Sequence, residues 1–391
     1  MRAILINSLT SGGAEKVVLT LLNRFKKTGE SMHLICLEHQ QYYDIPEGVK
    51  VSYLTRFQLF TESYYKFILL FISAFRLRKY VVDNNISLVQ SHLLSSSFVN
   101  IMSKIFGSKH HVQIIIHSRI NFDHLAFPLS YIKKKLYRWF FLKADAIISI
   151  SEVMKKELDD YLQLQEHSQH LVINNPHELK EIASMAKEEV KDFEFSDQKQ
   201  YIISAGRLAK GKRLEVLFKA LKRLRKNNNN IELLIVGDGP EEKIYKEFVK
   251  ALGIQQCVHF LSYQTNPYAY IARSDVFVLC SEWEGLPNII IESLICGTAV
   301  ISSDCISGPR EILNPESDLS VIVKDKIERG AFGLLYPVGS VDLLTKALQQ
   351  LLENEELRDH YVKKGLERAT DFDADRITKS YLKTFPKELR A

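Results

Sequence analysis

The chain has 391 residues, of which 46% are hydrophobic and 25% charged, with a net charge of +5. This length predicts two domains of about 190 residues each, because a single hydrophobic core rarely grows so large. The composition excludes a disordered or fibrous protein. Five cysteines without a C-x-x-C pair argue against a zinc site or a disulfide framework and favour a reducing, cytoplasmic compartment.

Charge is unevenly spread along the chain. Residues 1–150 carry 19 Lys and Arg against 9 Asp and Glu, a net +10, whereas residues 151–391 carry a net −5. A basic first half suits nucleic acid, anionic lipid or a phosphorylated acceptor, and composition does not choose among them. The apolar run 67–75 is shorter than the roughly 20 residues of a membrane span and predicts a packed helix.

The first half alternates short apolar strands with amphipathic helices, which is typical of a parallel sheet covered by helices on both faces. Strands are expected at residues 3–7, 32–37, 49–53, 88–91, 112–116, 146–150 and 171–173. Helices are expected at residues 14–27, 67–84 and 131–143.

The pattern lapses after Asn174-Asn175-Pro176, where residues 177–199 are polar. This places a domain boundary near residue 195 and predicts domains at 1–195 and 196–391. The alternation of strands and helices then resumes, with strands expected at residues 201–205, 232–236, 258–261, 276–279, 299–302 and 333–335. Two doubly wound domains in tandem predict a ligand cleft between them. Residues 341–390 predict helices that pack back on the first domain.

Two acids flank a turn in the second half. Glu284 opens the turn Glu284-Gly285-Leu286-Pro287-Asn288, and Glu292 lies in an apolar run that predicts a buried helix. A buried acid is costly without a partner outside its helix. Amides at the helix start can hold a phosphate, and each acid can accept from a sugar hydroxyl. The pattern therefore predicts a site for a nucleoside-diphosphate sugar; the alternative is a capped core helix with one stray acid.

Two cations follow the strand at 201–205. Arg207 and Lys212 lie five residues apart in a loop that leads into a helix starting at Leu214. A guanidinium fork and a point charge together can neutralise a diphosphate leaving group. The alternative is that both are ordinary surface cations.

Three further loops end at the same edge of the predicted sheet. Gly237-Asp238-Gly239-Pro240 allows close backbone approach to a ligand or only a tight turn, and the loop containing Tyr263 either contacts a base or is an edge loop. Ser307 and Pro309 predict a helix cap and a first-turn proline, with Arg310 pointing near the cleft.

In the first half, Gly12 and Gly13 free two amides at a helix start, without the dinucleotide fingerprint G-x-G-x-x-G. His117 ends the strand at 112–116, a position that favours function over a structural role. His92 lies similarly after the strand at 88–91, with less support for function than His117. Residues 131–141 mix four cations with large apolar side chains, which fits either a helix resting on an anionic membrane or a half-buried helix with a solvated basic side.

Taken together, these motifs resemble the retaining glycosyltransferases of family 4, which have the GT-B fold, over nearly the whole chain. The specific parts are Glu284-x7-Glu292, Gly206-Arg207 with Lys212, Gly237-Asp238-Gly239-Pro240 and Ser11-Gly12-Gly13-Ala14-Glu15. The segment 307–311 is most similar to members that build bacterial surface glycans on lipid carriers.

The resemblance implies roles for these residues. Glu292 would bind the ribose and Glu284 the donor sugar, and Arg207 and Lys212 would hold the diphosphate. His117 would lie against the transferred sugar. The remaining donor contacts would come from Gly12, Gly13, Gly237, Tyr263 and the amides of Gly285, Leu286 and Pro287.

The resemblance also implies retention of anomeric configuration by front-face attack, with no metal or other cofactor. The expected partners are a nucleotide sugar, UDP-linked by subfamily likeness, and a lipid-linked or oligosaccharide acceptor. An anionic membrane surface is a further expected contact, and nucleic acid is not expected. The expected location is the cytoplasm or the inner face of the cell membrane. One departure is Arg213, where family members commonly have glycine.

Three other functions stay open from the sequence. Glu38 follows the second strand where a ribose-binding acid of an NAD-dependent oxidoreductase belongs, although the glycine fingerprint is missing. An inactive glycan-binding protein on the same fold would not need Arg207, Lys212, Glu284 and Glu292. A nucleotide-sugar epimerase of the same fold is the nearest enzymatic alternative.

Overall fold

A computed structural model describes residues 1–10, 12–55, 65–120, 128–165 and 169–386. Ser11 of the predicted opening motif and the end of the predicted C-terminal helices lie outside these residues. The chain divides into two compact units: Met1–His177 together with the residues from Ala374 onward, and Glu178–Asp373. Residues 178–195 fall in the second unit, whereas the sequence places the boundary after them.

The first unit contains a seven-stranded sheet in the described residues, with strand order β3-β2-β1-β4-β5-β6-β7 and all pairs parallel. Its strands are β1 (Arg2–Ile6), β2 (Met32–Cys36), β3 (Val51–Tyr53), β4 (Leu88–His92), β5 (His111–Ile116), β6 (Ala146–Ser149) and β7 (His170–Val172). They lie within two residues of the predicted strands, because short apolar runs between turn residues leave little choice of secondary structure.

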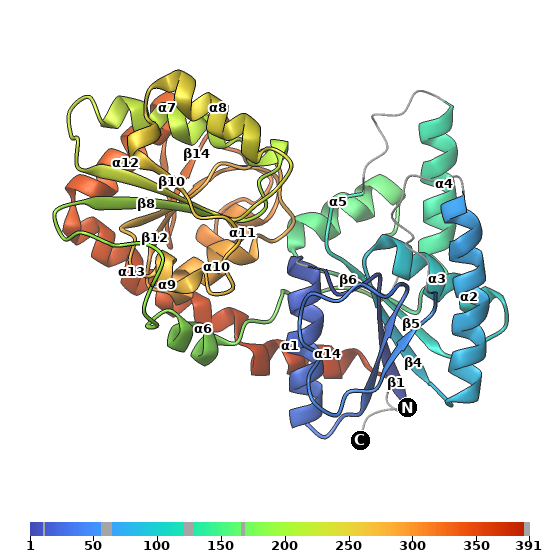
Figure 1. The fold of residues 1–391 in the computed structure, drawn as a ribbon. Helices are drawn as coiled ribbons and strands as arrows, with labels where there is room; N and C mark the ends of the chain where they lie inside the picture. The colour runs from blue at the N-terminus through green and yellow to red at the C-terminus, as the bar shows by residue number, and fades with distance from the viewer. Residues whose placement is uncertain (11, 56–64, 121–127, 166–168, 387–391) are drawn as a thin grey trace. The chain divides into compact units, whose positions relative to one another are not determined.

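Helices cover this sheet as the predicted βαβ rhythm requires (Figure 1). They are α1 (Gly13–Lys27), α2 (Tyr65–Asp83), α3 (Leu94–Ile105), α4 (Leu129–Phe141), α5 (Glu152–Leu162) and α14 (Ala374–Thr384). The C-terminal helix α14 packs beside α1, and the Phe25 and Phe385 rings lie 5.7 Å apart. A core of β1, β2, α2 and α3 side chains fills one face of the sheet.

The second unit has its own seven-stranded sheet in the described residues, with order β10-β9-β8-β11-β12-β14-β13. Its strands are β8 (Gln200–Ala205), β9 (Ile231–Val236), β10 (Val258–Phe260), β11 (Val276–Leu279), β12 (Ala299–Ser303), β13 (Glu328–Arg329) and β14 (Leu334–Tyr336). Among the strands described for this sheet only β13 runs antiparallel, at the edge, and the sequence does not predict it. Two residues are too few for a period-2 pattern.

Helices of the second unit lie on both faces of its sheet (Figure 1). They are α6 (Leu179–Met185), α7 (Leu214–Leu224), α8 (Glu242–Leu252), α9 (Tyr268–Ile271), α10 (Asn288–Ile295), α11 (Gly308–Leu313), α12 (Val341–Glu353) and α13 (Glu355–Ala369), with a 3₁₀ turn η1 (Lys210–Lys212). Helix α6 packs against α9 and α10, which is why the polar stretch after His177 belongs to this unit.

The apolar run 67–75 forms part of α2, but only half of the expected packing is present. Leu70, Ala74 and Leu77 are buried in the core of the first unit. Phe67 and Phe75 on the opposite side are 68% and 56% exposed. Among the helices that the structure describes, none has the length and hydropathy needed to cross a membrane.

Candidate active site

The carboxyl ends of β8 and β11 form the switch point of the second sheet. From β8 the chain moves outward to β9 and β10, and it returns through β11 to the opposite side. Ligands of open parallel sheets bind at such a point. The two following loops, 206–213 and 280–287, carry the predicted cations and the predicted acid turn. A small hollow lies here, lined by Ser204, Ala205, Gly206, Arg207, Leu208, Lys212, Leu214, Leu279 and Cys280.

Lys212 and Glu284 are brought together at this switch point. The Lys212 ammonium lies 2.7 Å from Glu284 Oε1, and the Ser281 hydroxyl donates to the same oxygen at 2.6 Å. Glu284 Oε2 makes no hydrogen bond to any residue in the described part of the chain. Because an ammonium has three N–H donors, two remain for a ligand. The pair therefore presents one acceptor and two donors on adjacent loops.

Arg207 lines the same hollow as Lys212 and is exposed. Its guanidinium forms no ion pair with a described residue, so its five donors stay available for an anion. The loop is tied to the acid turn by the Glu282 amide, which donates to Gly211 O at 2.8 Å. The Trp283 ring covers Gly211 so closely that an added Cβ would lie 3.3 Å from Nε1.

The acid turn offers fewer amides than the sequence suggests. Pro287 has no N–H group, so its predicted phosphate contact through an amide is wrong. The amides of Gly285 and Leu286 donate to no described residue, and both residues lie just before the N-terminal end of α10. Ser307 Oγ shares its one proton between the carbonyls of Glu284 and Gly285, at 3.0 and 2.9 Å, and so holds the turn in place.

Ser307 and Arg310 have structural roles that differ from the predicted ones. Ser307 is at the start of α11 but makes no side-chain capping bond, because its hydroxyl serves the acid turn. Pro309 lies in the first turn of α11, as predicted. Arg310 is 3% exposed and donates to Asp304 at 2.6 and 3.1 Å and to Glu328 at 2.7 and 3.1 Å. Its guanidinium is engaged in ion pairs with these two carboxylates and does not point to a ligand site.

Glu292 is buried in α10, and its partner lies in another helix. The Tyr268 hydroxyl in α9 donates to Glu292 Oε1 at 3.0 Å. The acid therefore has the partner outside its helix that the sequence predicts, and this partner is a protein side chain. With 6% of its surface exposed, the side chain offers only a small part to a ribose.

Gly237 is required by close backbone packing. Its φ is +127°, and a Cβ at this position would lie 2.2 Å from Gly206 O. Its amide donates to Ser262 O at 2.6 Å. Tyr263 is the next residue in the β10–α9 loop and is half-buried. These contacts join three loops that follow β8, β9 and β10, and they account for the glycine without a ligand.

In the first unit, a carboxylate occupies the start of α1. Glu15 is buried, accepts from Thr10 Oγ1 at 3.0 Å, and lies so close to Gly12 that an added Cβ would be 2.2 Å from Oε2. Burial raises the pKa of Glu15. The acid folds back on its own helix start, as in a capping box. The Gly12 amide donates to Thr10 O at 2.9 Å, and the Glu15 carboxylate packed against Gly12 disfavours a phosphate at this helix start.

His117 and His92 end β5 and β4 and contact each other. His117 Nε2 lies 2.9 Å from His92 Nδ1, with ring centroids 5.1 Å apart. Burial lowers the pKa of His117 to about 4 and that of His92 well below its usual range. Both rings are therefore neutral at pH 7. His117, Gly12 and Gly13 belong to the first unit, and the other predicted site residues to the second.

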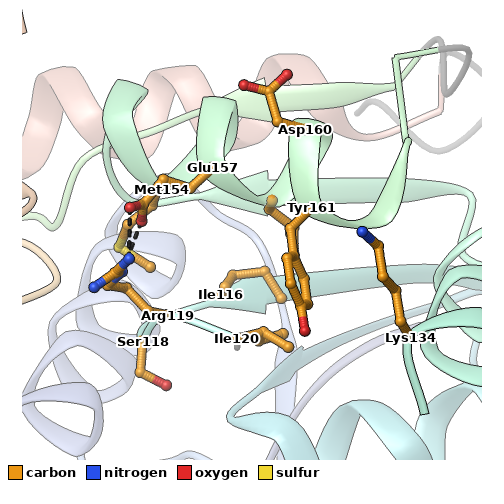
Figure 2. Close-up of a pocket in the computed structure, with 10 residues that line it drawn as sticks. Ile116, Ser118, Arg119, Ile120, Lys134, Met154, Glu157, Asp160 and Tyr161 are labelled. Carbon is orange, nitrogen blue, oxygen red and sulfur yellow. Dashed lines mark hydrogen bonds and ion pairs between the residues drawn. The ribbon is translucent and has the colours of Figure 1, made fainter. Parts of the chain in front are cut away.

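The first unit contains a hollow of about 420 Å³ lined by Ile116 and Ser118, the chain neighbours of His117 (Figure 2). Arg119 forms a bidentate ion pair with Glu157 at 2.7 and 2.8 Å, and the Lys134 ammonium lies 4.6 Å from the centre of the Tyr161 ring. Figure 2 shows the Tyr161 ring pointing into the hollow. The other lining residues are Ile120, Met154, Leu158 and Asp160. An apolar floor with charged groups around it suits a sugar ring with polar substituents.

Comparison with known proteins decides the family. The description "Glycosyltransferase Family 4" matches residues 11–179, and "Glycosyl transferases group 1" matches residues 185–368. A Campylobacter jejuni protein is 30% identical over 97% of this chain and 98% of its own length. It is named N-acetylgalactosamine-N,N'-diacetylbacillosaminyl-diphospho-undecaprenol 4-alpha-N-acetylgalactosaminyltransferase. The chain belongs to glycosyltransferase family 4.

Solved structures agree on the fold of this glycosyltransferase. A glycosyltransferase from Rickettsia africae superimposes with a TM-score of 0.77 over 98% of this chain and 97% of its own, at 15% identity. Anabaena HepE in complex with UDP gives 0.74 over 98% and 99%, also at 15% identity. At these identities the likeness shows the fold alone, which is GT-B. The predicted family and fold are confirmed.

Three residues of the candidate site are absent from the sequence prediction. Ser281 and Trp283 follow β11 directly, so the end of a parallel strand was a usable signal for them. Tyr268 lies on a four-residue helix 24 positions before Glu292, and no spacing rule connects them.

Proposed function

We propose that the second unit binds a nucleoside-diphosphate sugar and that this glycosyltransferase moves its hexose or N-acetylhexosamine to a saccharide hydroxyl. The observation that carries the proposal is the grouping of Lys212, Glu284 and Ser281 at the switch point, with Arg207 exposed in the same hollow. Cations, an oriented acceptor oxygen and free amides there match a diphosphate joined to a polyol.

Each group has a role in the proposed donor complex. Arg207 and the two remaining Lys212 N–H groups hold the diphosphate, together with the Gly285 and Leu286 amides at the start of α10. Glu284 Oε2 accepts from a hydroxyl of the donor sugar, while Lys212 and Ser281 hold Oε1 in place. Glu292 serves the ribose, and Gly237 and Tyr263 form the neighbouring loops beside the base. UDP is the proposed nucleotide.

The proposed chemistry retains the anomeric configuration without a metal ion. The bond from the anomeric carbon to the diphosphate oxygen breaks, and the acceptor oxygen bonds to that carbon from the same face. The acceptor proton passes to the departing diphosphate oxygen. Negative charge grows on the diphosphate as the bond breaks, so Arg207 and Lys212 stabilise the transition state more than the ground state.

The proposed acceptor is a lipid-linked saccharide used in assembly of a surface polysaccharide or lipopolysaccharide. The Campylobacter relative is named for a diphospho-undecaprenol acceptor, which supports this class. The hollow beside Ser118, Arg119 and Lys134 is the proposed acceptor subsite in the first unit. His117, whose chain neighbours Ile116 and Ser118 both line this hollow, is proposed to contact a sugar hydroxyl.

A membrane contact for the first unit is proposed from its exposed apolar side chains. Among the described residues, most large apolar side chains that are exposed lie on α2, α3 and α4: Phe67, Ile68, Phe71, Ile72, Phe75, Val82, Leu94, Ile105, Leu129, Tyr131, Ile132, Leu136, Trp139 and Leu142. The Phe71, Phe98 and Phe140 rings, with centroids 5.5 and 5.2 Å apart, join the three helices into one surface. We call it the α2–α4 surface.

Cations on the same helices favour an anionic bilayer as the partner of the α2–α4 surface. Arg76, Arg78 and Lys79 on α2 are exposed, as are Lys135 and Lys143 at α4. Apolar side chains beside Lys and Arg are typical of helices that lie in the interface of anionic membranes. The proposed location is therefore peripheral, on the membrane face that displays the lipid-linked acceptor.

Vesicle flotation tests this membrane contact. Wild type should float with vesicles that contain phosphatidylglycerol and float less at higher salt, since cations contribute. Phe67→Ser combined with Ile132→Ser should abolish flotation at unchanged melting temperature. Ile244→Ser on α8, also an exposed apolar residue, is the matched control and should float like wild type. Equal flotation of the double variant, or a dimer that the double variant dissolves, contradicts the membrane proposal.

Donor binding is tested separately by screening nucleotide sugars for thermal stabilisation of the full-length protein. One nucleotide sugar should raise the melting temperature of wild type and fail to do so for Arg207→Ala. The selected donor is then incubated with lipid-linked saccharides. Transfer supports the proposal, whereas conversion of the donor to its epimer without any acceptor would identify an epimerase.

A further inference from the structure

A chain of side-chain hydrogen bonds, buried in its middle and part-buried at both ends, runs through the first unit from the end of β5 to the C-terminal helix. His117 Nε2 lies 2.9 Å from His92 Nδ1, and His92 Nε2 lies 3.3 Å from Gln90 Oε1. Gln90 Nε2 donates to Gln113 Oε1 at 3.3 Å. Gln113 Nε2 donates to Thr384 O at 3.1 Å and to Thr384 Oγ1 at 2.9 Å. We call these five residues the His117 relay.

The direction of every bond in the relay is set at Thr384. Its backbone carbonyl can only accept. Its hydroxyl donates its one proton to Tyr381 O at 2.6 Å, so the hydroxyl oxygen must also accept from Gln113. Both amide protons of Gln113 therefore point to Thr384, and its carbonyl oxygen is turned toward Gln90.

The same donor-to-acceptor direction continues through Gln90 to the two histidines. Gln90 donates through Nε2, so its Oε1 accepts from a proton on His92 Nε2. A neutral imidazole carries one proton, which leaves His92 Nδ1 as an acceptor. His117 must then donate from Nε2. Burial lowers the pKa of both rings, which keeps each of them neutral at pH 7.

We propose that the relay locks His117 as its Nε2–H tautomer, so that Nδ1 presents a lone pair that accepts a hydrogen bond from a hydroxyl of the sugar substrate. Nδ1 of His117 bonds to no residue that the structure describes. The substrate contact rests on the proposed function, whereas the tautomer does not. Gln90, Gln113 and Thr384 are positioning residues that act through His92.

The relay also ties the site to the end of the chain. Thr384 closes α14, which follows the whole second unit in sequence and packs on α1 of the first unit (Figure 1). Gln113 and Thr384 are 271 positions apart. The orientation of His117 therefore depends on the return of α14 to the first unit.

Imidazole nitrogen NMR of the full-length protein, labelled with ¹⁵N-histidine, tests the tautomer directly. At neutral pH both His117 and His92 should show a protonated Nε2 and an unprotonated Nδ1, with assignments from His117→Gln and His92→Gln. A protonated Nδ1 on His117, or fast exchange between tautomers in wild type, would overturn the proposal.

Variants of the relay test the positioning role. Gln113→Leu removes the amide that fixes the donor-to-acceptor direction of the relay, and it should give mixed tautomers at His92 and His117. Thr384→Val keeps the carbonyl acceptor and should retain the wild-type tautomers. Ser103→Ala removes a buried hydroxyl that donates to Asn100 O outside the relay, and it should change neither ring. Circular dichroism checks that each variant is folded; if Gln113→Leu does not fold, Gln90→Leu makes the same test. Wild-type tautomers in the folded variant would refute the positioning role.

Substrate addition separates the two parts of the inference. Saturating donor with an unreactive acceptor should shift the His117 Nδ1 resonance and leave Nε2 protonated. An unchanged Nδ1 resonance in an enzyme that transfers sugar would overturn the substrate contact. If no nucleotide sugar is used at all, the proposed function fails, while the tautomer measured without ligand still decides the relay.

Discussion

Replacing Lys212 with methionine should lower turnover about 10²–10³-fold, because a donor aimed at developing charge contributes about 3–4 kcal/mol to the transition state. The same change should hardly affect folding. The Lys212 side chain is 30% exposed and that of Glu284 14%, although their charged atoms are 2.7 Å apart. A partly solvated ion pair of this kind adds only about 0–1 kcal/mol to the free energy of unfolding.

Glu284→Gln and the double variant Lys212→Met/Glu284→Gln decide whether Lys212 acts only by orienting Glu284 or whether each residue contacts the donor. Glutamine keeps the shape and can still accept from Ser281, which donates at 2.6 Å. If Lys212 only orients Glu284, the double variant should be no slower than Lys212→Met. If each residue contacts its own part of the donor, the double variant should be slower than either single variant.

The assay is initial-rate sugar transfer together with urea unfolding of each variant. Lys210→Met is the matched control, because Lys210 lies in the same 3₁₀ turn, is exposed and forms no ion pair with a described residue. It should keep nearly wild-type turnover. A rate for Lys212→Met within about threefold of wild type, far below the loss expected for a catalytic donor, would refute the assigned role.

Three further outcomes are expected. Burial lowers the pKa of His110 to about 4, below the roughly 6.5 of an unfolded histidine, so the free energy of unfolding should fall by up to about 3 kcal/mol as pH drops from about 6.5 toward 4. Urea unfolding across this range should show the fall, and His110→Gln should make it smaller by the His110 contribution, while His92 and His117, whose pKa values burial also lowers, keep theirs. Gly237→Ala should cost at least about 2 kcal/mol because its Cβ would meet Gly206 O, whereas Gly253→Ala, also at positive φ but with nothing within 4 Å, should cost about 1 kcal/mol in the same assay. Tyr268→Phe should cost about 1–3 kcal/mol by removing a donor from buried Glu292, and calorimetry should show weaker donor binding; unchanged stability and affinity would contradict that role.

Secondary structure was predictable for a definite reason. In the parallel sheets, strands buried on both faces read as short apolar runs between turn residues, so β11 was predicted to the residue and β8 and β9 within one. The two-residue β13 and the seven-residue α6 were missed, since each is shorter than the stretch over which a period can be recognised.

The solvent-exposed side of α2 was not predictable in the same way. The run 67–75 within α2 is apolar almost all around, which is typical of a buried helix. Burial depends on how many neighbours a helix receives, and the core of the first unit takes up one side of α2, with Leu70, Ala74, Leu77 and Val81 among its buried side chains. The uncovered side is what supports a membrane contact.

The sequence by itself determined the two parallel sheets, the family and the loops that carry Arg207, Lys212 and Glu284, since all of these follow from local patterns at strand ends. Only the tertiary structure decided which charges are free. In the structure Lys212 is paired with Glu284, and Arg310 forms ion pairs with two carboxylates. Tyr268 donates a hydrogen bond to Glu292, and a series of hydrogen bonds connects His117 with Thr384. Hydrogen bonds between residues far apart in the chain depend on distance and direction in space, and no spacing along a sequence encodes either.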